Sequence, residues 1–134
     1  MELKIKKPWH TKPPKTTDKY LALLALPDDT VTIAIRIYNS TNQSWMAYSG
    51  KLGMVPVTDV IAWTEFPTHW NSGFPGTAGI YLVSMVMPNQ KVALSIEHYS
   101  TKKESWYAYN KQTGFYILKG IKMWAELPEI PKQK

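Results

Sequence analysis

The sequence predicts a mainly β protein built from two tandem antiparallel β-meander repeats that pack as a pseudo-two-fold pair. Residues 9–67 can be laid over residues 70–128 without a gap, and identical residues recur along the whole overlay. An ungapped match of this length indicates an internal duplication. Each copy contains short apolar or alternating segments, and no segment keeps a 3.6-residue apolar period over a dozen positions. Strands are therefore expected throughout.

The duplication rests on aromatic, proline and glycine residues that return at one constant offset. The segment "SWMAY" at 44–48 returns as "SWYAY" at 105–109, and Trp-x-Glu-x-Pro at 63–67 returns at 124–128. Large aromatic residues rarely recur in register by chance, so two copies of one fold are expected. Further identical pairs are Trp9/Trp70, Pro14/Pro75, Tyr20/Tyr81, Pro27/Pro88, Tyr38/Tyr99 and Gly53/Gly114.

Each copy begins with an apolar segment of strand length, at 19–26 and at 80–87, followed by proline and polar residues typical of a turn. The next segment, 31–38 or 92–99, alternates, so one side of the strand should face a core. A histidine in that inward register is either a buried acid–base group or, as we favour, a residue satisfied by a hydrogen bond at the strand end. The residues expected to point inward are Val31, Ile33, Ile35 and Ile37, with His98 in the second copy.

Polar loops lead from these strands into 44–48 and 105–109, which predicts a hairpin in each copy. A last strand, at 59–63 or 120–124, closes each copy before a proline that cannot donate a ladder hydrogen bond. The segment 53–58, or its counterpart, leaves room for a single helical turn. In the first hairpin Trp45 and Ala47 share one face and Ser44, Met46 and Tyr48 share the other, and one of the two faces is expected to be exposed.

Four ranges describe the expected organisation: a basic N-terminal arm at 1–8, repeats at 9–67 and 70–128, and a tail at 129–134. A unit of about 60 residues buries only about 60% of its unfolded surface, so it is marginal alone. The two copies should therefore pack against each other. A monomer that is a pseudo-dimer and a homodimer both remain open.

Composition excludes several classes of protein. The chain has no cysteine, which excludes a disulfide scaffold, a cysteine-ligated zinc site and thiol catalysis. Its basic start is not followed by an apolar stretch, as a signal peptide requires, and the longest apolar run, "YLALLAL", is far too short to cross a bilayer. A protein of the cytoplasm without membrane contact is expected.

The net charge of +6 is unevenly distributed along the chain. Residues 1–19 carry +4 (6 − 2), residues 20–70 carry −2 (2 − 4), and residues 71–134 carry +4 (8 − 4). A basic balance suits nucleic acid or an acidic protein surface, although scattered lysines also serve solubility. The second copy changes the polar loop "NSTNQS" into "STKKES", which adds Lys102 and Lys103 at a hairpin tip.

No enzyme motif is present, so we expect no catalytic residue, no metal and no cofactor. None of the three histidines has a ligand-like neighbour two or four residues away. Glu65 and Glu126 are the only acidic residues that both copies share. Paired carboxylates can perform general acid–base work if they meet in one cleft. We favour the alternative, in which each carboxylate accepts backbone N–H bonds where the last strand ends.

Paired tryptophans could form stacking platforms for bases or sugars. Tryptophan at equivalent places in two repeats is more often part of a core, and this applies less strongly to Trp45 and Trp106. The residues assigned to the structural core are Trp9, Trp70, Trp63 and Trp124.

The order of these features resembles a small phage and prophage domain of unknown function. The pattern is Trp, then Pro, an apolar strand, an alternating strand with a Trp-x-x-Tyr hairpin partner, and apolar-x-Trp-x-x-Leu-Pro. One copy runs from "PWHTKPP" to "IAWTEFP" and a second from "HWNSGFP" to "KMWAELP", with departures from the common final phrase at Thr64-Glu65 and Ala125-Glu126. The resemblance implies a phage-derived or mobile-element accessory protein of the bacterial cytoplasm, and it brings no catalytic residue.

The leading expectation for function is a non-catalytic accessory protein that binds a bacterial or phage protein, for example to inhibit a host defence system. Its aromatic anchors would be Tyr48, Tyr107 and Tyr109. The alternative is nucleic-acid binding, in which lysines neutralise phosphates. These would come from the Lys-rich N-terminus and from Lys102, Lys103, Lys111, Lys119 and Lys122 of the second copy.

Overall fold

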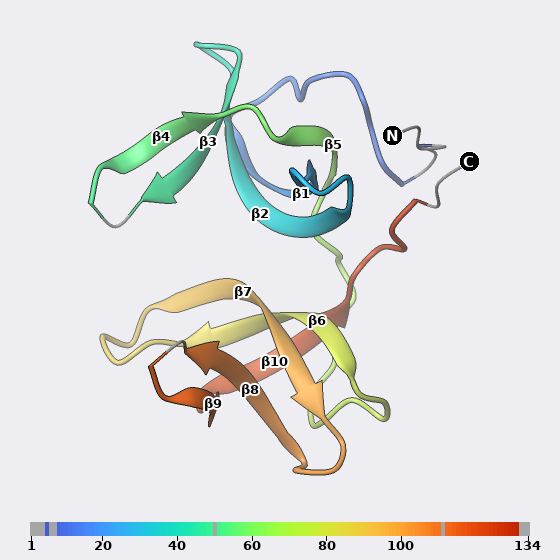
Figure 1. Ribbon diagram of the computed structural model, residues 1–134, viewed down its shortest axis with the longest axis vertical. Coiled ribbons are helices and arrows are strands. Elements are labelled where there is room, and N and C mark those ends of the chain that lie inside the picture. The colour runs from blue at the N-terminus through green and yellow to red at the C-terminus, as the bar shows by residue number, and fades with distance from the viewer. Residues whose placement is uncertain (1–4, 6–7, 50, 111, 132–134) are drawn as a thin grey trace. The chain divides into compact units, whose positions relative to one another are not determined.

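The computed structural model describes residues 5, 8–49, 51–110 and 112–131. Every regular element within these residues is a β-strand, so the expected mainly β class is confirmed (Figure 1). No helix in this part of the chain is long and apolar enough to cross a membrane.

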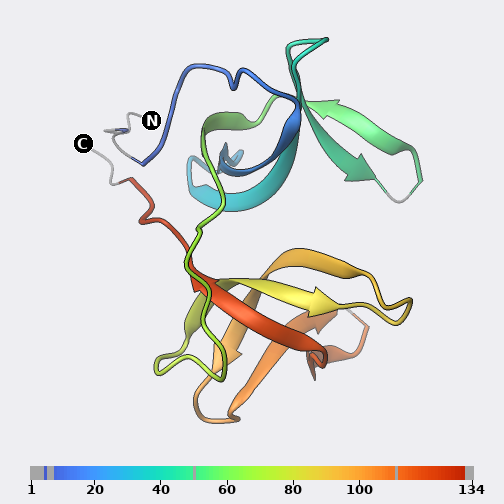
Figure 2. The same cartoon turned by 180° about the vertical axis from the view of Figure 1, so that it is seen from behind.

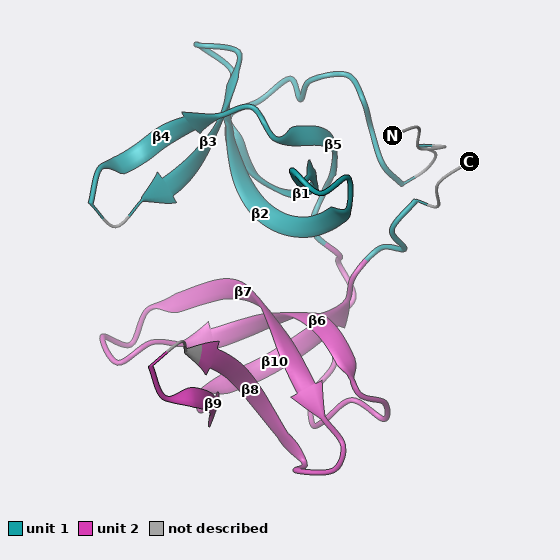
Figure 3. Cartoon of the chain, in the orientation of Figure 1, with its two compact units in different colours: residues 1–66, 128–134 teal, residues 67–127 magenta. Residues whose placement is uncertain are grey.

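The chain divides into two compact units (Figure 3). Unit 1 comprises residues 1–66 with 128–134, and unit 2 comprises 67–127. Glu129, in the range expected to be a tail, is bonded to unit 1, because its carbonyl accepts a hydrogen bond of 2.9 Å from Nε1 of Trp9. Most of the basic arm and the last three residues lie outside the described residues. The packing of the two repeats as a pseudo-two-fold pair stays a prediction.

Each unit is one five-stranded antiparallel sheet (Figures 1 and 2). The first four strands of a unit form a meander, and the fifth returns to the opposite edge to pair with the first. Unit 1 has the order β4-β3-β2-β1-β5, with β1 (Asp18–Ala25), β2 (Val31–Asn39), β3 (Ser44–Ser49), β4 (Gly53–Val57) and β5 (Val60–Thr64). Unit 2 has the order β10-β6-β7-β8-β9, with β6 (Gly79–Val86), β7 (Val92–Ser100), β8 (Ser105–Asn110), β9 (Gly114–Ile117) and β10 (Ile121–Glu126).

The two sheets also share one register. Tyr38 pairs with Trp45 in unit 1, and Tyr99 pairs with Trp106 in unit 2. The irregularity between Leu23 and Leu24 returns as a register shift at the matching place in the pairing of β10 with β6. The duplication seen in the sequence is therefore a duplication of backbone structure.

The segment 53–58 contains a strand rather than the helical turn for which the sequence leaves room. Gly53 and Gly114 have φ values of 73° and 79°, in the left-handed region that glycine enters without a Cβ clash. The chain reverses there after β3 and after β8, so that β4 and β9 can pair back. Each sheet thereby gains an edge strand that the sequence analysis did not predict.

The core of unit 2 is aromatic and lies on one face of its sheet. Tyr81, Val83, Tyr99 and Trp106 are buried together, and Tyr81 contacts Trp106 edge to face at a ring-centroid distance of 5.9 Å. The Tyr81 hydroxyl donates to the Thr77 carbonyl at 2.9 Å, and Tyr20 bonds Thr16 in the same way in unit 1. Large rings bury more apolar area than aliphatic side chains, so this face becomes the core.

The expectation of an inward aliphatic face is wrong for the second copy. Val92, Leu94 and His98 are exposed, and His98 stacks on Tyr107 at a ring-centroid distance of 5.4 Å. Alternation predicts two faces but does not say which one is buried, and here the aromatic face provides the larger core. In unit 1 the aliphatic face is partly covered, because Trp9 packs with Leu23 and Ala62.

The four tryptophans assigned to the core differ in their burial. Trp9 is buried, whereas Trp70, Trp63 and Trp124 are half-buried. Trp63 and Trp124 lie on β5 and β10, which are edge strands, so fewer neighbouring strands cover their rings. Most of each side chain is nevertheless covered, and Trp124 packs against the core of unit 2. Trp106, on an inner strand, is fully part of that core.

The turn after β1 supports a test of pH dependence. Asp28 accepts hydrogen bonds from the Thr30 hydroxyl and the Thr30 amide, and these bonds lower the pKa of its carboxyl below the ordinary 3.8. Because the pKa is lower in the folded state, the ionised carboxyl stabilises the turn at pH values above its ordinary pKa. This stabilisation is lost as the pH falls through the lowered pKa. We expect the Thr30 amide resonance to titrate below about pH 4. Asp28→Asn should keep the turn and remove the titration, since Asn89 makes the matching bond in unit 2; titration that persists in this variant would contradict the assignment.

Candidate functional site

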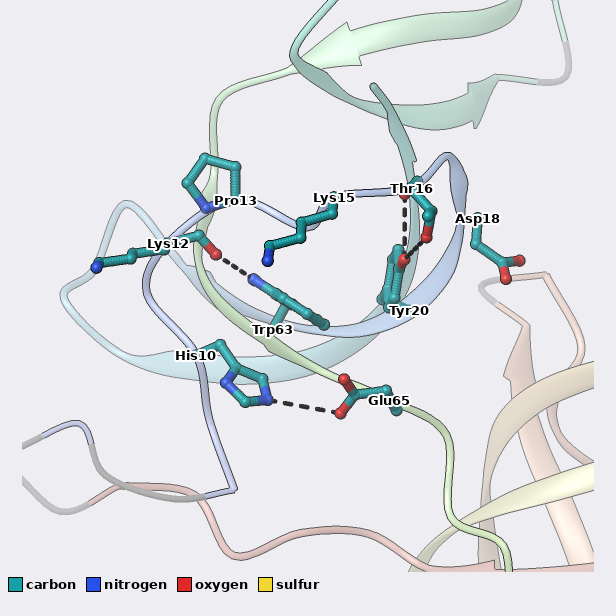
Figure 4. Close-up of a pocket in the computed structure, with 9 residues that line it drawn as sticks. All are labelled: His10, Lys12, Pro13, Lys15, Thr16, Asp18, Tyr20, Trp63 and Glu65. Carbon is teal, nitrogen blue, oxygen red and sulfur yellow. Dashed lines mark hydrogen bonds and ion pairs between the residues drawn. The ribbon is translucent and has the colours of Figure 1, made fainter. Parts of the chain in front are cut away.

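Unit 1 contains a pocket of about 530 Å³ between the segment that precedes β1 and strand β5 (Figure 4). Trp63 lies at its centre, in contact with the rings of His10 and Tyr20. The pocket is lined by His10, Lys12, Pro13, Lys15, Thr16, Asp18, Tyr20, Trp63 and Glu65.

The segment before β1 is held on the edge of the sheet by backbone and side-chain bonds to a single residue. The His10 amide donates to the Trp63 carbonyl at 2.8 Å, and the Trp63 amide donates to the His10 carbonyl at 3.0 Å. Nε1 of Trp63 donates to the Lys12 carbonyl at 2.5 Å. Trp63, in the Trp-x-Glu-x-Pro motif at the end of the first repeat, therefore fixes the segment with which the same repeat begins.

The polar side chains of the pocket carry both signs of charge. Nε2 of His10 lies 3.5 Å from Oε2 of Glu65, and both side chains are about half exposed. The expectation that Glu65 accepts backbone N–H bonds is therefore replaced by a contact with an imidazole. The Thr16 hydroxyl is bonded to the Tyr20 hydroxyl at 2.9 Å. No group of three or more His, Asp or Glu that could hold a metal is found in the described part of the chain.

Apart from Glu65, the charged and titratable residues of this pocket occur only in the first copy. Unit 2 keeps the scaffold residues Thr77, Tyr81, Trp124 and Glu126 at the matching positions. Nε1 of Trp124 is buried without a hydrogen-bond partner, and Gly73 stands where Lys12 supplies a carbonyl in unit 1. His10, Lys12, Lys15 and Asp18 are replaced by Asn71, Gly73, Gly76 and Gly79.

A second site is an apolar surface on the hairpin of β8 and β9, which we call the hairpin face. It consists of Tyr107, Tyr109, Phe115 and Ile117, which point to the same side because Tyr107 pairs with Ile117 and Tyr109 pairs with Phe115. Tyr109, Phe115 and Ile117 are 62%, 64% and 59% exposed. Phe115 contacts the rings of both tyrosines edge to face, at ring-centroid distances of 5.5 and 5.1 Å. Side chains that contact one another and remain exposed form a continuous apolar patch.

A hollow of about 220 Å³ lies at one end of the hairpin face. It is lined by Ser100, Lys103, Tyr107 and Phe115. Ser100 also accepts a hydrogen bond of 3.2 Å from the Lys103 amide, which fixes the turn that carries this lysine. The hollow therefore combines two aromatic rings with the hydroxyl of Ser100 and the ammonium group of Lys103.

The hairpin of unit 2 brings together three of the five predicted binding residues, namely Tyr107, Tyr109 and Lys103. Lys102 is exposed in the adjacent turn and does not line the hollow. Tyr48 is 76% exposed on the matching hairpin of unit 1. Lys119 and Lys122 are exposed, and Lys111 lies outside the described residues.

Phe115 and Ile117 belong to the hairpin face but were missed in the sequence. Their signal was the alternation within "GFYIL" at 114–118, directly after a glycine. The run is short, and its first-copy counterpart contains Pro56, which argues against an ordinary strand. Comparison of this chain with family models, with curated proteins and with solved structures found no match.

Proposed function

We propose that this chain is a non-catalytic binding protein whose hairpin face contacts another protein. The observation that carries the proposal is the hairpin face, in which the exposed side chains of Tyr109, Phe115 and Ile117 adjoin the partly buried Tyr107. Exposed apolar patches with a polar rim are typical of protein interaction sites, and aromatic residues supply most of the binding energy there. Lys103 at the hollow and Lys102 beside it provide such a rim.

The setting of this function is proposed from the resemblance to the phage and prophage domain. An accessory protein of a phage or mobile element would act in the bacterial cytoplasm on a host or phage protein. A host defence protein is one such partner, and binding through an aromatic patch would block a surface that this partner needs. The aromatic patch supports this proposal, because it can bind a partner protein without any catalytic residue.

Nucleic-acid binding is the second candidate, favoured by the exposed Lys102 and Lys103 in the turn before β8. Glu104 follows them directly and is also exposed, which weakens attraction for a phosphate backbone. The exposed rings of the hairpin face could stack on bases, but Ile117, which lies among them, has no ring on which a base can stack. The protein partner is therefore preferred.

The test is capture of partners from a bacterial lysate on the full chain, with and without nuclease. We expect a protein that stays bound after nuclease treatment and at raised salt, because apolar anchors are little affected by ionic strength. The matched variant Lys102→Thr with Lys103→Asn restores the first-copy residues at the turn. It should slow association and leave the bound protein unchanged. Capture that disappears with nuclease, together with affinity for duplex DNA that falls with a log–log salt slope of about −0.9 per phosphate, would establish the second candidate instead.

A further inference from the structure

We propose that the free edge of β9 binds an extended segment of the partner protein as an additional strand of the sheet in unit 2. The segment would have apolar residues at alternate positions and acidic residues at the end that lies beside Ile117. This inference rests on the proposed function, since it assigns a binding mode to the same hairpin. It adds hydrogen bonding by the backbone to the contacts of the aromatic side chains.

The backbone at this edge is free to pair. β9 is the last strand in the order β10-β6-β7-β8-β9, so only β8 pairs with it in the described sheet. The Leu118 amide donates to the Trp106 carbonyl at 2.8 Å. Backbone groups in an antiparallel pair alternate in direction, so those of Tyr116 also point to β8. The N–H and C=O groups of Phe115 and Ile117 therefore point away from β8, toward the open side.

The first copy closes the corresponding edge with a proline. Pro56 stands on β4 where Ile117 stands on β9, and it pairs with Met46 as Ile117 pairs with Tyr107. A proline at this outward-facing position removes a donor from the free edge, which is a common way to prevent strand addition. The second copy has isoleucine there and keeps the donor.

The other outer strands are also partly protected. His10 forms a β-bridge with Trp63 on β5, and Asn71 forms one with Trp124 on β10. Within the described residues, β9 is the outer strand with neither a proline nor a bridging segment. Exposed and apolar edges of this kind readily accept a strand from another chain.

The side chains of β9 suit an apolar segment on both faces of the sheet. Phe115 and Ile117 are exposed on the hairpin face, and Tyr116 is 46% exposed on the opposite face. An added strand would place its own side chains alternately beside these two groups. The hollow at Phe115 would receive one apolar side chain of the added strand, next to the ammonium group of Lys103.

The basic charge near the β9 edge favours an acidic segment of another protein over a second copy of this chain. Lys103 precedes β8 and exposed Lys119 follows β9, and because the two strands are antiparallel both basic groups lie near the end of the edge at Ile117. A segment with acidic residues at that end would pair with them. Two copies joined through β9 would instead bring like charges together in a chain of net charge +6.

The experiment uses the full chain and a displayed library of random 12-residue peptides as the probe. We expect enriched peptides with apolar residues at alternate positions and Asp or Glu toward one end. Ile117→Pro should weaken their binding at least about tenfold, because it removes the outward N–H that Pro56 already lacks in unit 1. Ile117→Val keeps that N–H and is the matched control. On the wild-type chain, a bound peptide should slow hydrogen exchange of the Phe115 and Ile117 amides, a readout that needs no variant.

The results that would contradict strand addition differ from those that would contradict protein binding as such. Peptides that lose binding with Phe115→Ser but keep it with Ile117→Pro would show side-chain contact alone, which overturns strand addition and leaves protein binding standing. A library without enriched peptides, or unchanged exchange at Phe115 and Ile117, would also overturn it. Self-association that Ile117→Pro abolishes would assign the edge to a second copy and contradict the acidic partner.

Discussion

Replacing Trp106 by alanine is expected to lower the free energy of unfolding of unit 2 by about 3–5 kcal/mol. Trp106 is 4% exposed and contacts Tyr81 and Tyr99 edge to face, at ring-centroid distances of 5.9 and 5.1 Å. Its removal leaves a cavity in the small aromatic core that holds this sheet together. Because a domain of this size has only several kcal/mol of stability, much of unit 2 should unfold at room temperature.

The measurement is urea denaturation of both variants, followed by amide resonances assigned to each unit. Trp45→Ala is the matched control, because Trp45 occupies the same position in unit 1 and is only half-buried. It should cost less than Trp106→Ala. Equal losses in the two variants, or a loss below about 1 kcal/mol for Trp106→Ala, would contradict the assignment of the core in unit 2.

Replacing Tyr109 and Phe115 together by serine is expected to weaken binding of the captured protein at least about 100-fold, or about 2.7 kcal/mol. The two rings contact each other at a centroid distance of 5.1 Å and are both largely exposed, so they can be truncated without a cavity. Each ring would be a central anchor of the interface, and serine removes its apolar area.

Calorimetric titration of the purified partner would measure this loss. The matched control is Tyr48→Ser with Met54→Ser, which truncates the corresponding pair on the hairpin of unit 1. The control should change affinity less than threefold, and both variants should unfold at the wild-type temperature. A control that loses as much affinity as the Tyr109 and Phe115 variant would place the binding surface on both hairpins.

The sequence predicted the fold class and most of the strands, because strand alternation and turn residues are local signals. It missed β4 and β9, since Pro56 contradicts strand propensity and edge strands depend on pairing that the sequence alone does not reveal. The buried face was assigned wrongly in the second copy. Val92 and Leu94 alternate as core residues do, yet the larger aromatic side chains on the other face form the core.

The candidate sites were predicted in part. Tyr107 and Tyr109 were chosen as anchors because they alternate along the hairpin strand, while the sequence left open which of its faces is exposed; the structure buries the face of Trp106. The pocket of unit 1 was not predicted, because it requires the segment at His10 to bridge Trp63 across more than fifty residues of sequence. A comparison of the two copies could have indicated it, since His10, Lys12 and Lys15 have no charged counterparts in the second copy.

Divergence between the two copies gives each unit a different surface on the same backbone. Unit 1 has a pocket that carries charge, and its β4 edge is closed by Pro56. Unit 2 has glycine or asparagine in place of His10, Lys12, Lys15 and Asp18, and it has an aromatic hairpin with an open edge. This pattern suits a duplicated protein in which the second copy became the binding unit.

The most direct test of this account is an exchange of the hairpin between the copies. Residues 105–117 are replaced by the sequence of residues 44–56, which has the same length and the same register. We expect the chimera to keep its ten strands and to lose the captured protein, because the hairpin face and the open β9 edge are both removed. A chimera that folds and binds the partner with wild-type affinity would contradict the account.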